Sequence, residues 1–326
     1  MIRLLPRLLL LTACSVSPVP EQLPDEITPV TNIEQFPSTL SLAYFSTMKL
    51  EGKDFTLGDV LSSNSAYTRY TVTYSSNGLQ ISGILNIPTG DGPFPLMVMN
   101  HGYIARSVYT NGRGLKREQD FFARNGYAVF HSDYRGHAFS DPSPLPDDTS
   151  IYDAGIEYSM DVLNGITALT SAGIPQIDTS SIFMLGHSLG GGVSMNIAVT
   201  YPDLLDGLIL YAPVHIDAYE NFYRWRDMRL EVDNIEKVIG SRESDSEFWD
   251  KISSLSLISN LKTPVLLFQG TNDTDVPADW AEFLAEELRE NDKQMEYLLY
   301  EGEKHEFINK FPAFMKKSKE FTDLLL

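Results

Sequence analysis

The sequence of 326 residues is poor in cysteine and in basic charge. Cys14 is the only cysteine, so the chain cannot form an internal disulfide or a zinc site built from several thiolates. Its 25 Lys and Arg stand against 44 Asp and Glu, which gives a formal net charge of −19. Nucleic-acid binding depends on cations that neutralise phosphates, so this balance argues against a nucleic-acid partner.

Long apolar runs are also lacking. No segment beyond the first 14 residues approaches the roughly 20 consecutive apolar residues of a membrane-spanning helix. Hydrophobic residues still make up 43% of the chain and charged residues 21%, which is typical of a globular domain with a large core. We therefore expect one globular domain at residues 41–326, with any membrane attachment at the N-terminus.

The first residues have the pattern of an export signal. Arg3 and Arg7 supply positive charge, and residues 8–11 are apolar. The tetrapeptide Leu-Thr-Ala-Cys that ends at Cys14 resembles a bacterial lipobox. This resemblance implies a lipoprotein signal peptide at residues 1–13, a diacylglycerol on Cys14 and a location in the bacterial cell envelope. A chance cysteine in an apolar leader is the alternative.

Residues 14–40 are expected to form a lipidated tether. Five prolines occur between positions 15 and 39, among Ser, Thr and Glu. Such a composition cannot bury a core and favours an extended chain. The segment therefore connects the anchor to the globular domain.

The rest of the chain alternates short apolar runs with helix-length stretches. The expected strands are residues 70–74, 79–87, 95–100, 127–132, 182–186, 207–211, 265–269 and 295–300. The expected helices are residues 115–125, 151–172, 188–200, 277–290 and 310–324. Asn77-Gly78 predicts a hairpin between the first two strands. The pattern predicts an α/β fold, with about eight strands in a mostly parallel sheet and helices on both faces.

Residues 215–261 interrupt this alternation. They are richer in charge and in aromatic residues, among them Trp225 and Trp249. The segment is long for a connection, so we expect a small helical cap inserted into the domain. Its aromatic side chains favour a substrate with an apolar or ring-bearing group.

Residues 186–190, Gly-His-Ser-Leu-Gly, contain a candidate nucleophile. They lie between an expected strand and an expected helix, where a sharp turn lifts the hydroxyl of Ser188 above the sheet. Side chains two positions to either side would collide in such a turn, which explains both glycines. The amides at the start of the following helix face developing negative charge.

A serine nucleophile needs a base, and the base needs a carboxylate partner. Asp273 follows the expected strand at 265–269, and His305 follows the last strand. His305 is the only histidine after His215. We expect His305 to be the base and Asp273 to orient it, with Asp275 or Asp279 as alternatives for the acid.

Acyl transfer also needs donors for the oxyanion. The backbone amide of Leu189, next to the nucleophile, is one candidate. The amide of Tyr103 is the second, because His101-Gly102-Tyr103 follows the strand at 95–100. The other five histidines show neither His-x-x-x-His nor Glu-x-x-His spacing, so we expect no metal site.

With these residues in place, residues from about 68 to 324 resemble the catalytic domain of the prolyl oligopeptidase family, within the α/β-hydrolase superfamily. The resemblance rests on residues 101–103, 133–137 (Asp-Tyr-Arg-Gly-His), 186–191, 270–277 and the loop around His305. It implies an acyl-enzyme serine hydrolase without a cofactor, acting on a small-molecule ester or a short peptide. The large β-propeller of the family peptidases has no counterpart before the first strands.

Four functions remain open at this point. A prolyl-oligopeptidase-like peptidase is slightly favoured. A carboxylesterase of the dienelactone-hydrolase-like type uses the same residues, as would acyl transfer to an acceptor other than water. A non-catalytic binding lipoprotein is the alternative from another class, but it would have no chemical reason to assemble a nucleophile, a base and an acid in this order.

Overall fold

The computed structural model describes residues 40–144, 155–226 and 241–326. The predicted signal peptide, Cys14 and residues 14–39 of the predicted tether lie outside the described residues. Within the described ranges, no helix has the length and apolarity needed to cross a bilayer.

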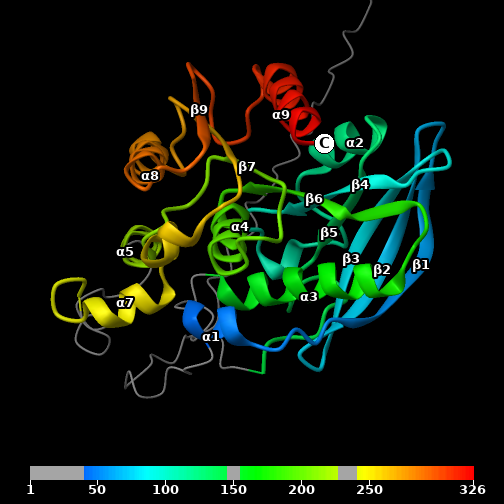
Figure 1. Ribbon diagram of the computed structural model, residues 1–326, viewed down its shortest axis with the longest axis horizontal. Coiled ribbons are helices and arrows are strands. Elements are labelled where there is room, and N and C mark those ends of the chain that lie inside the picture. The colour runs from blue at the N-terminus through cyan, green and yellow to red at the C-terminus, as the bar shows by residue number, and fades with distance from the viewer. Residues whose placement is uncertain (1–39, 145–154, 227–240) are drawn as a thin grey trace, which may run out of the picture.

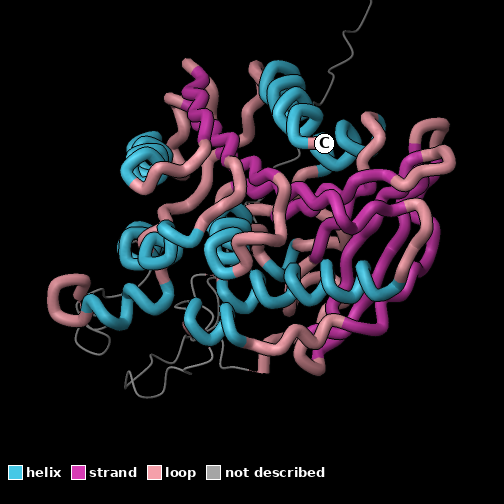
Figure 2. Tube along the Cα trace, viewed as in Figure 1, coloured by secondary structure: helices cyan, strands magenta, loops and turns pink. Residues whose placement is uncertain are grey.

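Within these ranges, nine strands form one sheet in the order β1-β2-β3-β5-β4-β6-β7-β8-β9. The strands are β1 Lys53–Ser63, β2 Tyr67–Ser76, β3 Leu79–Pro88, β4 Phe94–Asn100, β5 Ala128–Ser132, β6 Ile177–His187, β7 Gly207–Tyr211, β8 Val265–Gly270 and β9 Met295–Tyr300. The pairs from β1 to β5 are antiparallel, and those from β5 to β9 are parallel. Figure 2 shows the strands as one twisted sheet between helices.

All eight expected strands are present, and β1 is the strand that the sequence pattern missed. Its residues are exposed except for Phe55, which is half-buried. An edge strand with so little buried surface carries no alternation of apolar and polar residues, so no periodic signal marks it.

The turn between β2 and β3 confirms the hairpin expected at Asn77-Gly78. Ser76 pairs with Leu79 across a two-residue loop. Asn77 has φ 49° and Gly78 has φ 84°, and two positive φ values define the turn that matches the twist of antiparallel strands.

Helices cover both faces of the sheet (Figure 1). They are α1 Leu42–Thr47, α2 Lys116–Arg124, α3 Ile156–Ala172, α4 Leu189–Thr200, α8 Ala278–Glu290 and α9 Phe311–Leu325. Side chains of α1, α3, α4 and α8 pack in one hydrophobic core. Those of α2 and α9 pack in a second core on the opposite face. The expected α/β architecture is therefore confirmed, with nine strands rather than eight.

The described part of the expected cap is helical. It contains α5 Ala218–Arg226, α7 Ser246–Ile252 and the 3-10 helix Ser254–Asn260, and it lies at the end of the sheet away from β1 (Figure 1). The ring of Trp249 lies 5.1 Å from Tyr219 and 5.3 Å from Phe222. Trp249 and Phe222 are buried and belong to the same hydrophobic core as α3 and α4, so these two rings attach the cap to the domain. A substrate role of the cap aromatics stays a prediction.

Candidate active site

Ser188 occupies a strained turn between β6 and α4. Its φ of 56° and ψ of −123° are avoided by most residues with a side chain. A Cβ atom on Gly190 would lie 2.0 Å from the carbonyl oxygen of Asn100, and one on Gly186 would lie 2.5 Å from the carbonyl oxygen of Gly190. Both glycines are thus required by close backbone approach, as the motif predicted.

Asp273 and His305 are hydrogen-bonded to each other. The distance from His305 Nδ1 to Asp273 Oδ2 is 2.8 Å. The other carboxylate oxygen, Oδ1, accepts the amides of Asp275 and Val276, each at 2.9 Å. Burial alone would raise the pKa of Asp273, but the bond and charge of His305 and the two amides outweigh it, so the pKa is lowered.

The three candidates for the acid differ in their contacts with His305. Asp275 is exposed, and it contributes its backbone amide to Asp273. Asp279 is exposed in the first turn of α8. The side chain bonded to the imidazole of His305 is that of Asp273.

Three side chains from outside the 304–307 turn hold the loop that carries His305. His187 Nε2 lies 3.1 Å from the carbonyl oxygen of His305. Arg117 donates to the carbonyls of the next two residues, at 2.6 and 3.4 Å. The buried carboxylate of Glu303 accepts the amides of residues 308 and 310, at 2.8 and 2.5 Å. Sequence reasoning found none of these three roles.

The two oxyanion candidates are Leu189, which directly follows Ser188 in the chain, and Tyr103, which directly follows Gly102. Leu189 is the first residue of α4, so its amide belongs to the turn whose N–H groups lack an intrahelical acceptor. A Cβ atom on Gly102 would lie 3.0 Å from the Cβ of Ser188, which places the backbone before Tyr103 against Ser188. The oxyanion role of the Leu189 and Tyr103 amides stays a prediction.

Comparisons with known proteins identify the family of the chain. The family model of the prolyl oligopeptidase family, Peptidase_S9, matches residues 113–324, more than half of the chain. The chain belongs to the prolyl oligopeptidase family. This result confirms the expected α/β-hydrolase fold and the serine hydrolase class.

Proteins with sequences similar to this chain include a peptidase and an esterase. The chain is 23% identical over 239 residues to an uncharacterized peptidase of Bacillus subtilis, YtmA, which covers 73% of this chain and 86% of the relative. It is 23% identical over 171 residues to the esterase FrsA of Klebsiella pneumoniae, which covers 52% of this chain and 38% of the relative.

Two solved structures illustrate the shared fold. The acylaminoacyl peptidase of Pyrococcus horikoshii superposes with a TM-score of 0.61 at 22% identity, covering 79% of this chain and 41% of that chain. The chain thus spans about two fifths of that peptidase. The acetyl xylan esterase of Paenibacillus sp. R4 gives a TM-score of 0.63 at 18% identity, covering 92% of this chain and 96% of that chain.

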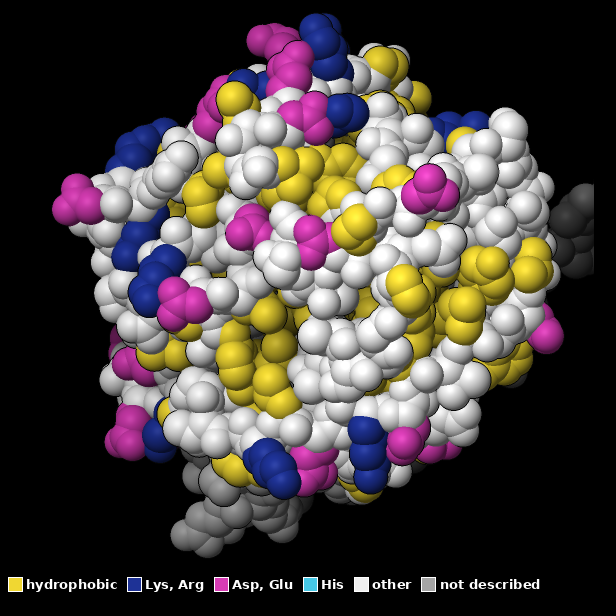
Figure 3. Space-filling model, turned by 45° about the vertical axis from the view of Figure 1, so that its right-hand side comes forward, with side chains coloured by type: hydrophobic (Ala, Val, Ile, Leu, Met, Phe, Trp, Pro, Cys, Tyr) yellow, Lys and Arg dark blue, Asp and Glu magenta, His cyan; other side chains and the backbone are white. Residues whose placement is uncertain are grey.

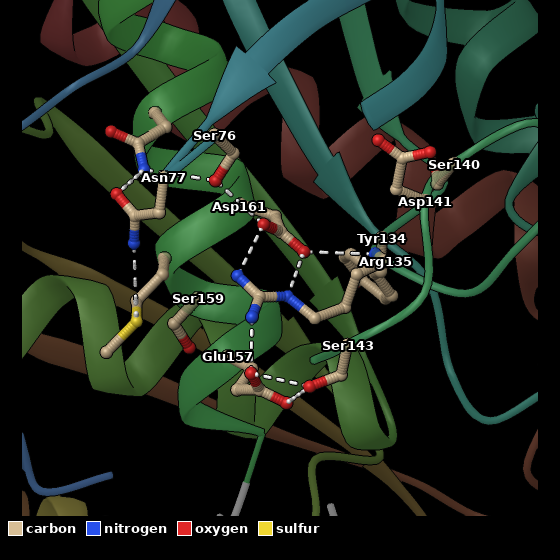
Figure 4. Close-up of polar contacts among 12 residues, drawn as sticks. Ser76, Asn77, Tyr134, Arg135, Ser140, Asp141, Ser143, Glu157, Ser159 and Asp161 are labelled. Carbon is tan, nitrogen blue, oxygen red and sulfur yellow. Dashed lines mark hydrogen bonds and ion pairs between the residues drawn. The ribbon is translucent and has the colours of Figure 1, made fainter. Parts of the chain in front are cut away.

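The family motif at residues 133–137 forms a buried ion-pair network (Figure 4). Arg135 donates from Nε and Nη2 to the two carboxylate oxygens of Asp161, at 2.9 and 2.8 Å. Its Nη1 pairs with Glu157, which also accepts from Ser143. The network ties the loop after β5 to helix α3 and so supports the sheet edge where the site lies.

A stack of buried rings lies beside the site. His101 packs 4.3 Å from Tyr134, 4.9 Å from Tyr109 and 5.2 Å from His131, measured between ring centroids. Burial lowers the pKa of His101 to about 3 and lowers the pKa of His131 as well. Both rings are therefore neutral in the folded protein near neutral pH, and neither has the charge or exposure of a base that exchanges protons with substrate.

One group of possible metal ligands occurs among the described residues. Carboxylate and imidazole atoms of Asp273, Asp275 and His305 lie within 4.8 Å of one another. Two tetrahedral zinc ligands about 2.0–2.1 Å from the ion lie about 3.3 Å apart, whereas Asp273 and His305 are 2.8 Å apart. The spacing matches a hydrogen-bonded acid–base pair.

Proposed function

We propose that the protein hydrolyses an ester or a peptide-like amide bond of a small substrate through an acyl-enzyme on Ser188. The observation that carries this proposal is the 2.8 Å bond between Asp273 and His305, in loops that follow β8 and β9 at the same sheet edge as the strained Ser188. Parallel strands bring the loops after their carboxyl ends together.

The mechanism follows from the roles of these atoms. His305 Nε2 takes the proton of the Ser188 hydroxyl while the oxygen attacks the substrate carbonyl. Asp273 keeps the proton of His305 on Nδ1 and stabilises the imidazolium that forms. The amides of Leu189 and Tyr103 donate to the oxyanion. His305 then protonates the leaving group, and a water activated in the same way releases the acyl group.

A short peptide is the slightly favoured substrate, on the basis of the family match at residues 113–324. Ester hydrolysis is the second candidate. The superposition includes 96% of the acetyl xylan esterase chain but 41% of the acylaminoacyl peptidase chain. The structure that is similar along its whole length is therefore that of an esterase.

A labelling experiment tests the proposal. The purified protein and its Ser188→Ala variant are treated with a fluorophosphonate probe, and both are then assayed with p-nitrophenyl esters and aminoacyl anilides. We expect labelling of the wild type alone. A faster kcat/KM on anilides would support the peptidase and a faster kcat/KM on esters the esterase, whereas an unlabelled folded wild type would support a binding protein instead.

We also propose, from the sequence alone, that Cys14 carries a lipid that anchors the protein in the bacterial cell envelope. The lipobox-like tetrapeptide and the proline-containing segment after it support this proposal. Metabolic labelling with a fatty acid analogue should mark the wild type and not the Cys14→Ser variant. Equal labelling of both would exclude a lipid on Cys14.

On the face shown in Figure 3, Lys and Arg side chains are scattered among Asp and Glu rather than gathered in one basic area. This distribution agrees with the overall charge of −19, and the face shown offers no basic area for a phosphate backbone. A small neutral substrate fits the proposed chemistry better than a polyanion.

A further inference from the structure

Arg224 connects the cap to the loop that carries Asp273. The side chain extends from α5, in the cap, and its guanidinium donates two hydrogen bonds to backbone carbonyls of that loop. Nε lies 2.9 Å from the carbonyl oxygen of Asp275, and Nη2 lies 2.9 Å from the carbonyl oxygen of Thr274. The cap thus contacts the loop after β8, called the acid loop below, through a charged side chain. Both of these donors of the guanidinium bind main-chain carbonyls of that loop.

The same two peptide groups bind Asp273 on their other side. The carbonyl of Thr274 and the amide of Asp275 belong to one peptide group, and the carbonyl of Asp275 and the amide of Val276 belong to the next. Those two amides are the donors to Asp273 Oδ1, each at 2.9 Å. Two planar peptide groups therefore separate the guanidinium of Arg224 from the carboxylate of Asp273.

We propose that Arg224 is a positioning residue for Asp273, which it orients and polarises through the two peptide groups of residues 274–276. This inference rests on the proposed function, because it concerns the acid of that site. It also assigns a role to the cap, since α5 contributes to the geometry of the acid.

The physical basis is cooperative hydrogen bonding. A cation that binds a peptide carbonyl polarises the peptide group and makes its N–H a stronger donor. Both donors to Asp273 Oδ1 are strengthened in this way, which favours the ionised carboxylate. The two bonds from Arg224 also fix the planes of both peptide groups, and thereby the direction of Oδ2 toward His305.

Aromatic rings hold the guanidinium in place. The Cζ atom of Arg224 lies 5.3 Å from the ring centroid of Trp225 and 5.7 Å from that of Trp280, within cation–π range. Trp280 is in the first turns of α8, directly after the acid loop. The arginine is therefore held by rings from the cap and from the body of the domain.

Arg242 provides a matched control within the same cap. Its guanidinium pairs with Asp217 at 3.2 Å and with Asp250 at 2.7 Å. Both partners belong to the cap segment, so this arginine stabilises the cap. In the described part of the chain it makes no hydrogen bond or ion pair with residues 273–276. Loss of Arg242 reports the effect of a loosened cap, and loss of Arg224 reports that effect together with the loss of the peptide contacts.

The first experiment compares Arg224→Met, Arg224→Lys and Arg242→Met in the full-length protein, with an ester substrate. We expect Arg224→Met to lower kcat about tenfold with little change in KM, because a small misplacement of a catalytic group costs up to about 10²-fold. Arg224→Lys keeps the charge but not the paired geometry, so we expect partial activity. Arg242→Met should retain kcat. Equal losses in Arg224→Met and Arg242→Met would overturn the proposal in favour of a general effect of the cap.

The second experiment is a double-mutant cycle with Asp273→Asn. If Arg224 acts through Asp273, Arg224→Met should cause no further loss of kcat/KM in the Asp273→Asn background. A tenfold loss in both backgrounds would overturn the proposal. Free guanidinium, at concentrations too low to unfold the protein, should restore activity in Arg224→Ala and not in Arg242→Ala.

These results are distinguishable from a failure of the proposed function. If Ser188→Ala and Asp273→Asn leave activity unchanged, the catalytic assignment is wrong whatever the arginine variants do. If both abolish activity while Arg224→Met leaves kcat and KM at wild-type values, the catalytic assignment stands and the role of Arg224 is refuted.

Discussion

The imidazole of His187 donates a hydrogen bond from Nε2 to the backbone carbonyl of His305, at 3.1 Å. A carbonyl oxygen only accepts, so Nε2 must carry the proton of the neutral ring. The ring of His187 also stacks on the ring of Tyr211, and their centroids are 4.1 Å apart. Burial, and then the neighbouring His305, lowers the pKa of His187. His187, which directly precedes Ser188, thus fixes the backbone of the proposed base.

This contact predicts that His187→Phe lowers kcat and leaves KM nearly unchanged. Phenylalanine keeps a ring for Tyr211 but has no donor for the His305 carbonyl, so we expect a loss of about tenfold by misplacement of the base. His187→Gln keeps a donor and is the matched control, with a smaller loss expected. Steady-state kinetics on the ester used above measures both, and equal kcat values for Phe and wild type would contradict the role.

Asp273 should be far more sensitive to substitution than its neighbour Asp275. An amide at 273 keeps the shape of the acid but favours the wrong tautomer of the base, which costs about 10⁴-fold in kcat in a serine–histidine–aspartate site. Asp275→Asn changes an exposed carboxylate and keeps the backbone amide that binds Asp273, so we expect activity within about threefold of wild type. Similar losses in both variants would show that the acid was assigned to the wrong residue.

Much of the fold could be predicted because its strands bury apolar side chains. The strands β4, β5, β7 and β8 are nearly or wholly buried, and each follows or precedes an amphipathic helix. The sequence therefore shows the alternation typical of a parallel sheet. The exposed β1 gave no such pattern, and the boundaries of the cap helices could not be derived from composition.

The proposed catalytic residues could be predicted for a different reason. Ser188 lies in a local motif, and the candidate acid and base each follow a strand. The supporting residues could not be found in this way, since their contacts join distant parts of the chain. Arg117 contacts residue 306 across 189 positions, and Arg224 contacts residue 275 across 51 positions. Nothing in the sequence around an arginine indicates which carbonyls it will meet.

Arg135 should be essential for stability. Its side chain is 5% exposed, and those of Glu157 and Asp161 are 5% and 0% exposed. Removing the cation leaves two buried carboxylates without its charge, a change that costs about 3–5 kcal/mol in comparable buried pairs. We therefore expect Arg135→Met to lower the free energy of unfolding by about that amount in urea titrations.

A control separates charge from packing in this network. In the double variant Arg135→Met, Asp161→Asn, one of the two unpaired carboxylates becomes a neutral amide. Part of the lost free energy of unfolding should therefore be recovered. Arg124→Met is a surface control, because Arg124 pairs with Asp120 where both side chains are about half exposed. Its loss should lower the free energy of unfolding far less than the loss of Arg135, because solvent screens an exposed pair. A comparable cost for Arg124 and Arg135 would contradict the account of the buried network.

The buried histidines predict that the protein loses stability in mild acid. The pKa of His101 is lowered to about 3 and that of His131 is also lowered, both mainly by burial. An unfolded histidine has a pKa of about 6.5, so the unfolded chain binds more protons than the folded chain below that pH. Stability is therefore unaffected by these residues above pH 6.5 and falls as the pH decreases from 6.5 toward the folded pKa values.

Urea unfolding at pH 8 and at pH 5 measures this effect. His101 alone should lower the free energy of unfolding by about 2 kcal/mol at pH 5, because 1.5 pH units at about 1.4 kcal/mol per unit separate that pH from 6.5. In His131→Met, the free energy of unfolding should differ less between pH 8 and pH 5 than it does in the wild type. Neither ring nitrogen of His131 has a hydrogen-bond partner among the described residues, so the replacement leaves no such bond broken there. If this variant loses as much unfolding free energy between pH 8 and pH 5 as the wild type, His131 takes up its proton without unfolding.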